Sequence, residues 1–172
     1  MTTMHVTGHR NEVSSSVDSF LANLPELLGA MMVDPRCLVA VIEFEDGRYV
    51  QFRMTGERVV IGEVVSNLNI GDAVALTSED EAMLRRGGWS EPSPGPHPNW
   101  RFEAHDVAGL IRLVTMVRDA VLDVLGETGR RTVSVRTWAM DPSGRSTEED
   151  LYEGRVYYQE ALREIERRLN AG

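Results

Sequence analysis

The feature that most constrains the fold is a series of three short β-type segments with almost no chain between them. Residues 37–45 and 58–65 are rich in Val and Ile, and residues 48–54 alternate apolar and polar side chains. Tight turns of Gly-containing sequence, at 46–47 and 55–57, separate the three segments. Parallel neighbours need a crossover of a dozen or more residues, so connections this short predict an antiparallel meander in chain order.

Apolar residues at helical spacing predict a long helix on each side of this meander. The first covers residues 16–32 after a run of capping serines, and Pro25 inside it predicts a kink or a restart. The second covers residues 106–126, with Asp106 as its N-cap and Gly126 at its end. We expect the stripe of Leu110, Val114, Val117 and Val121 to pack on the sheet. The residues at the helical spacing are Val107, Leu110, Ile111, Val114, Val117, Val121, Leu122 and Leu125.

Four further elements complete the predicted architecture. A short helix is expected at 79–86, strands at 100–104 and 132–140, and a last helix at 147–169. Gly62, inside the third meander strand, is interpreted as a β-bulge. The predicted fold class is α+β, an antiparallel sheet of four or more strands with helices packed on one face and at the ends.

The chain of 172 residues has the length of one domain. Residues 1–14 lack a clear period and are interpreted as a loose N-terminal tail, with a short edge segment as the alternative for 1–13. Residues 15–172 are then expected to form a single domain.

The charge and composition disfavour several classes of function. The chain carries 27 acidic residues against 18 basic ones, all of them Arg, for a net charge of −9. Such a chain repels phosphate backbones, so we expect no nucleic-acid partner. It has no apolar run long enough for a membrane span and no secretory signal, so we expect no membrane partner and a cytoplasmic location. Its one cysteine, Cys37, opens an apolar strand and is interpreted as a buried hydrophobe without redox chemistry.

No catalytic, metal-binding or phosphate-binding motif occurs in the sequence, so we expect no enzyme activity, no metal and no cofactor. His105-Asp106 resembles part of a catalytic triad in composition only, because Asp106 already serves as a helix cap. His97 lies in a Pro-rich loop, residues 90–99, and is interpreted as facing solvent.

Trp89 and Trp100 bracket this loop. We expect both rings to be largely buried and to hold the loop against the body of the protein. The alternative is that they form an aromatic wall of a peptide groove.

The motifs around this loop resemble those of a known family. Leu84–Trp89 reads LRRGGW, Pro98–Phe102 reads PNWRF, and the helix that follows begins DVAGLIRLV. In this order they resemble the actinobacterial TY-Chap-type proteins, which are related to YbjN and to type III secretion chaperones. The resemblance implies a YbjN-like, type III secretion chaperone-like α+β fold. It also implies a non-catalytic role in binding a protein or peptide. Its motif residues here are Trp89, Asn99 and Trp100, as candidates for partner binding or loop anchoring.

The leading hypothesis is therefore a chaperone-like module that captures an extended segment of a partner protein. An open strand edge or an apolar groove with Met or aromatic side chains would hold that segment. Type III secretion chaperones are often dimeric, so the resemblance is compatible with a homodimer. The alternatives are a structural subunit of a larger assembly, and an enzyme whose unrecognised site lies near the Pro-rich loop.

Overall fold

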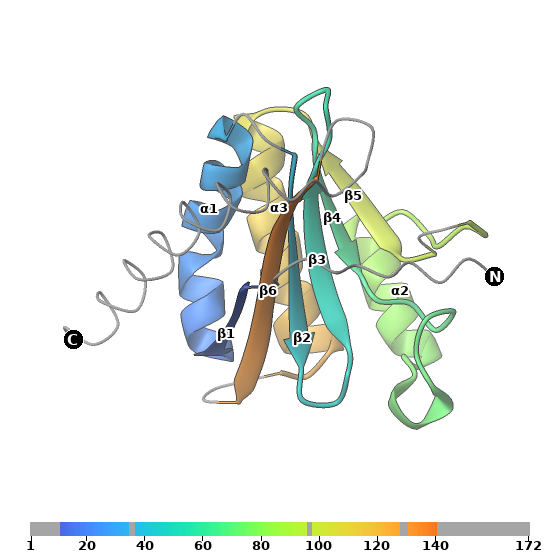
Figure 1. The fold of residues 1–172 in the computed structure, drawn as a ribbon. Helices are drawn as coiled ribbons and strands as arrows, with labels where there is room; N and C mark the ends of the chain where they lie inside the picture. The colour runs from blue at the N-terminus through green and yellow to red at the C-terminus, as the bar shows by residue number, and fades with distance from the viewer. Residues whose placement is uncertain (1–10, 35–36, 96–97, 128–130, 141–172) are drawn as a thin grey trace.

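A six-stranded antiparallel sheet forms the centre of the molecule (Figure 1). The computed structural model describes residues 11–34, 37–95, 98–127 and 131–140. The strands lie in the order β1-β6-β2-β3-β4-β5. Their bounds are β1 Asn11–Ser16, β2 Cys37–Phe44, β3 Tyr49–Met54, β4 Val60–Val64, β5 Trp100–Ala104 and β6 Thr132–Met140.

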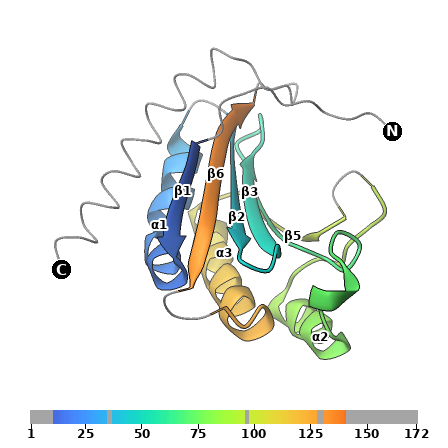
Figure 2. The same cartoon turned by 60° about the horizontal axis from the view of Figure 1, so that its bottom comes forward.

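The helices lie on one face and at one end of this sheet. They are α1 (Val17–Val33), α2 (Ser78–Gly87) and α3 (Val107–Asp119), and α3 continues into a π-helical turn, η2 (Ala120–Val124). A short 3-10 turn, η1 (Asp72–Val74), precedes α2. Figure 2 shows α1 and α3 behind the same face of the sheet, while α2 lies apart and packs against η2. The predicted α+β class and the antiparallel sheet are confirmed.

The strand order confirms the meander and adds one feature that local patterns did not show. Strands β2, β3 and β4 are neighbours in chain order, as predicted. Strand β6, from the far end of the described chain, inserts between β1 and β2 and pairs with both. The last described strand therefore lies inside the sheet, and β1 forms its edge.

Residues 11–14 differ from the expected loose tail. Asn11–Ser16 forms the edge strand β1, paired with β6 from Asn11↔Thr137 to Ser16↔Thr132. The alternative of a short edge segment is the correct description of these residues. Residues 1–10 and the predicted helix 147–169 lie outside the described residues.

Gly62 is not a bulge. It occupies a regular position in the sheet, with Phe52 opposite on β3 and Phe102 opposite on β5. A Cβ at Gly62 would lie 2.5 Å from Cδ1 of Leu113 on α3, so the glycine allows the helix to approach the sheet closely. The bulge prediction was wrong because a glycine in a strand marks either a bulge or the close approach of another element, and the sequence alone does not distinguish the two.

Helix α1 is one continuous helix across Pro25. The Oγ of Ser16 caps it by accepting from the backbone N–H of Ser19 at 3.1 Å. Pro25 is exposed, while Leu24 and Leu28 on either side are buried in the core. Packing on both sides of the proline keeps the helix intact, so the predicted restart does not occur.

Helix α3 is capped by Asp106, as predicted, and not every residue of its apolar spacing is buried. Leu113 is completely buried, whereas Val107 and Ile111 are exposed. The stripe of Leu110, Val117 and Val121 packs on the core as expected, and Val114 is half-buried beside it. In the described part of the chain, no helix is long and apolar enough to cross a membrane.

Candidate functional site

An apolar groove runs between α1 and α3 on the helical face of the molecule. It has a volume of about 300 Å³, and its lining residues are Pro25, Leu28, Gly29, Met32, Val33, Val107, Leu110, Ile111 and Val114. Three of them project into solvent, with exposed fractions of 74% for Val33, 66% for Val107 and 65% for Ile111. We call this feature the α1–α3 groove. None of its lining side chains carries a charge or a hydrogen-bonding group.

A glycine keeps space open on the α1 side of this groove. A Cβ built at Gly29 would meet no atom within 4 Å. Arg58 fixes the nearby end of α1, because its guanidinium donates to the main-chain carbonyls of Met32 and Asp34. A cation at the C-terminus of a helix is favourable, so this contact holds the groove wall in place.

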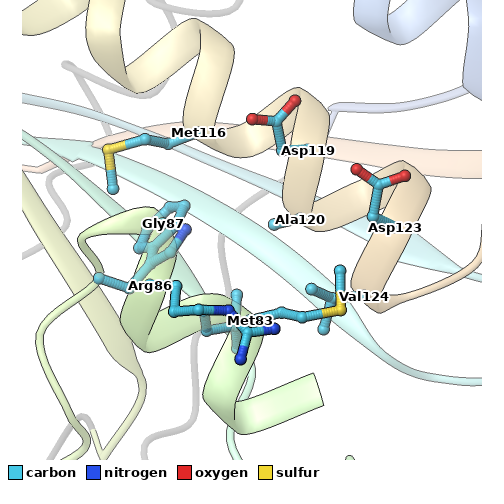
Figure 3. A pocket seen from close by; sticks show the side chains of 10 residues that line it. Met83, Arg86, Gly87, Met116, Asp119, Ala120, Asp123 and Val124 are labelled. Atoms are coloured by element: carbon cyan, nitrogen blue, oxygen red, sulfur yellow. The ribbon is translucent and has the colours of Figure 1, made fainter. Parts of the chain in front are cut away.

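A second hollow lies between α2 and the end of α3 (Figure 3). It has a volume of about 220 Å³, and its lining residues are Met83, Leu84, Arg86, Gly87, Trp89, Met116, Asp119, Ala120, Asp123 and Val124. Figure 3 shows Met83 and Arg86 on α2 and Met116, Asp119 and Asp123 on the facing helix, with the two carboxylates at the rim and turned away from α2. We call this feature the α2–α3 pocket. Unlike the groove, it combines an apolar lining with charged groups.

The LRRGGW motif forms the end of α2 and sets the position of Trp89. Gly88 takes a left-handed conformation with φ of 95°, and its N–H returns to the carbonyls of Leu84 and Arg85. The N–H of Trp89 also donates to the carbonyl of Leu84, at 3.1 Å. This is the hydrogen-bonding pattern of a glycine-terminated helix, and it turns the chain so that Trp89 enters the core.

Both tryptophans are buried, as the sequence predicted, with exposed fractions of 4% for Trp89 and 1% for Trp100. The residues next to them, Ser90 and Arg101, pair through two main-chain hydrogen bonds of 2.8 and 3.1 Å. Of the two rings, only that of Trp89 lines one of the hollows described above. The guanidinium of Arg85 lies 5.8 Å from the centre of the Trp100 ring.

Asn99 is a buried polar residue with partners inside the fold. Its Oδ1 accepts from Nδ2 of Asn69 at 2.7 Å and from the Tyr49 hydroxyl at 3.3 Å. These bonds connect the start of β5 to the segment after β4. Asn99 lines neither hollow.

The two sheet edges differ in how much main chain they leave unpaired. The outer edge of β5 is partly covered, because Arg101 pairs with Ser90. Strand β1 pairs with β6 on one side, and no strand of the described residues pairs with its other side. Among the described residues, β1 is therefore an edge strand of the sheet.

The His105-Asp106 pair has structural contacts. Oδ1 of Asp106 accepts from the N–H of Gly109 at 2.7 Å and caps α3. Nε2 of His105, an exposed side chain, lies 3.5 Å from Oε2 of Glu103. Among the described side chains, no group of three or more His, Cys, Asp or Glu residues could hold a metal. His97 and the side chain of Cys37 lie outside the described set.

Comparison with known families agrees with the resemblance in the motifs. Residues 11–139, well over half of the chain, match the model of the TY-Chap3 family, described as T3SS (YopN, CesT) and YbjN peptide-binding chaperone 3. No curated protein and no solved structure gave a significant match. The chain belongs to the TY-Chap3 family of peptide-binding chaperones, related to type III secretion chaperones and YbjN.

Proposed function

We propose that this protein is a non-catalytic chaperone-like module that captures an extended segment of a partner protein in the α1–α3 groove. The observation that carries the proposal is the set of three exposed aliphatic side chains, Val33, Val107 and Ile111, around an uncharged groove. Isolated exposed hydrophobics are common, but a contiguous apolar patch is typical of an interaction site. Membership of a peptide-binding family supports a peptide as the occupant.

The energetics suit a reversible complex. Burying one aliphatic side chain contributes roughly 1.5–3 kcal/mol, and micromolar affinity requires about 8 kcal/mol. Apolar side chains of a partner, together with the groove residues that they cover, supply apolar burial of this order before the cost of ordering the segment. Strand β1, the edge strand among the described residues, offers main-chain hydrogen bonds as a second means of holding an extended segment.

The charge of the chain indicates the kind of partner. A net charge of −9 favours basic partner segments, and the attraction weakens as salt rises. The proposal includes a cytoplasmic protein with a protein or peptide partner, without nucleic-acid or membrane binding and without catalysis. A homodimer is compatible with it.

The proposal is tested with an array of overlapping peptides from proteins of the source organism, followed by calorimetry on the peptides that bind. Ile111→Ser should abolish binding of these peptides, since it places a hydroxyl in the groove. The matched control is Leu68→Ser, because Leu68 is an equally exposed aliphatic residue outside the groove. Peptides that bind both variants alike would refute the groove as the site.

A structural subunit of an assembly is the second candidate, and the same exposed patch favours it. It predicts that the groove is covered by another protein chain rather than by a short peptide. Sedimentation of the wild type and of Ile111→Ser separates the two. A permanent oligomer that Ile111→Ser dissociates, in a protein that binds no peptide, would replace peptide capture with assembly.

A further inference from the structure

We infer that the α2–α3 pocket binds a basic side chain, arginine or lysine, of the captured segment. The inference rests on the proposed function, because it names the chemistry of the partner. The aliphatic part of the basic side chain lies against the apolar lining, and its cationic head meets Asp119 and Asp123. The pocket thereby supplies a charge-selective contact that the uncharged α1–α3 groove cannot.

The apolar lining suits the stem of such a side chain. Met83 and Met116 lie on opposite walls (Figure 3), and Trp89 and Val124 complete the apolar part. Methionine side chains are flexible and polarizable, so they adapt to a long unbranched chain. Arginine and lysine bury their stems on apolar surfaces while they keep the charge at the rim.

Asp123 lies where the end of the helix disfavours a negative charge, and Asp119 lies one turn before it. Asp119 is the last residue of α3 and Asp123 lies in η2, four residues on. Because α3 continues into η2, the C-terminal end of this helical segment, with its partial negative charge, lies at Asp123 rather than at Asp119, and like charges four residues apart repel. Both side chains are exposed, and within the described part of the chain neither forms an ion pair. A bound cation would relieve both unfavourable terms.

The acidic residues of α2 show the contrast. Glu79, Asp80 and Glu81 occupy the first turn of that helix, where its dipole favours them, and Asp80 takes part in the capping box. Their positions are explained by helix stability. Those of Asp119 and Asp123 are not.

Within the described residues no arginine forms an ion pair with Asp119 or Asp123, and this includes Arg118, which directly precedes Asp119. Arg86, on the facing wall, forms an ion pair with Glu79 at 2.7 Å. The guanidinium of Arg112 lies 5.2 Å from the centre of the Phe102 ring of β5. The pocket lining thus holds one arginine and two aspartates, and its net charge is negative.

The backbone at this place is also unusual. At η2 the N–H of Leu125 donates to the carbonyl of Ala120 at 2.8 Å, which is the five-residue spacing of a π-helix. Single π-turns occur frequently at functional sites, because they reorient side chains that a regular helix would space evenly. This turn carries Asp123 and Val124 of the pocket lining.

The first experiment uses n-butylguanidinium as a mimic of the arginine side chain and n-pentanol as an uncharged control. Both are titrated into the full chain while the ε-methyl signals of Met83 and Met116 are followed by NMR. Met83→Leu and Met116→Leu assign these signals. We expect saturable shifts of both methyls with n-butylguanidinium and much weaker shifts with n-pentanol.

The charge is then removed with the double variant Asp119→Asn, Asp123→Asn. Its matched control is Glu57→Gln, Asp72→Asn, which makes the same change in net charge at exposed positions outside the pocket. Binding of n-butylguanidinium should weaken about fivefold in the first variant and stay unchanged in the second. Equal binding to both double variants, or no saturable shift in the wild type, would overturn the inference.

The second experiment links the pocket to peptide capture. A peptide that binds the wild type is compared with a twin in which citrulline, uncharged and similar in shape, replaces its arginine. The twin should bind the wild type several-fold more weakly, and the preference should vanish in Asp119→Asn, Asp123→Asn. If the two peptides bind alike but Ile111→Ser still abolishes binding, the proposed function stands and this inference fails. If no peptide binds, the proposed function fails.

Discussion

Leu113 of α3 packs directly on Gly62 at the centre of β4, with Cδ1 only 2.5 Å from the position that a Cβ of the glycine would take. This contact fixes the distance between the helix and the sheet. It thereby fixes how α3 presents its two flanks, one toward the α1–α3 groove and the other toward the α2–α3 pocket.

The first prediction concerns this contact. Gly62→Val should destabilise the protein by about 1–3 kcal/mol, because extra atoms in a packed core force side chains from their preferred rotamers. Chemical denaturation measures the loss. Adding Leu113→Ala should recover part of it, and Gly71→Ala, where an added Cβ meets nothing within 4 Å, is the control. A Gly62→Val protein as stable as the wild type would contradict the close approach.

The second prediction concerns Trp100. Trp100→Ala should cost about 3–5 kcal/mol as a large-to-small change in the core. Trp100→Phe should cost clearly less, since the buried Nε1 of Trp100 has no hydrogen-bond partner and its removal leaves no polar group unpaired. Denaturation of both variants tests the order. If Trp100→Phe lowers the free energy of unfolding as much as Trp100→Ala does, the expectation that the indole nitrogen has no partner is contradicted.

The sequence carried most of the strand and helix assignments but not their arrangement. Short turns at 46–47 and 55–57 dictate the meander, because no other pairing can be reached by so few residues. The insertion of β6 between β1 and β2 is a long-range pairing, and no local pattern specifies it. Burial of Trp89 and Trp100 was predicted correctly from their place beside the loop.

The candidate site was less accessible to sequence analysis. Val107 and Ile111 lie on the apolar spacing of α3, and this spacing does not indicate which of its residues stay exposed. The pattern cannot show that α1 stops short of covering them. The pocket likewise joins residues from α2, α3 and η2 that are far apart in sequence. One sequence signal for the pocket was available. Asp123 is an acidic residue near the C-terminal end of a helix, where the helix dipole disfavours a negative charge.

The third prediction tests this effect of the helix dipole. Asp123→Asn, in the last helical turn, should raise the stability of the free protein by about 0.3–1 kcal/mol at low salt, Asp119→Asn should raise it by less, and both gains should shrink as salt rises. Thermal denaturation at two salt concentrations measures both effects. A loss of stability on either substitution would show that the carboxylate already has a stabilising partner.

The fourth prediction separates helix capping from catalysis at His105-Asp106. Asp106→Ala should cost about 1 kcal/mol, because it leaves the N–H of Gly109 without its acceptor. His105→Ala should change stability little, since its side chain is exposed. Peptide binding should survive both substitutions. An activity lost equally in both variants would instead favour the enzyme alternative.

The most direct test of peptide capture in the α1–α3 groove is calorimetry of one peptide, identified on the array, with wild type, Gly29→Leu and Leu68→Ser. Leucine at position 29 should occupy the open space beside α3, and it favours a helix by roughly 0.5–1 kcal/mol over glycine. The account predicts that Gly29→Leu is at least as stable as the wild type and does not bind the peptide, while Leu68→Ser binds normally. Undiminished binding to a folded Gly29→Leu protein would contradict it.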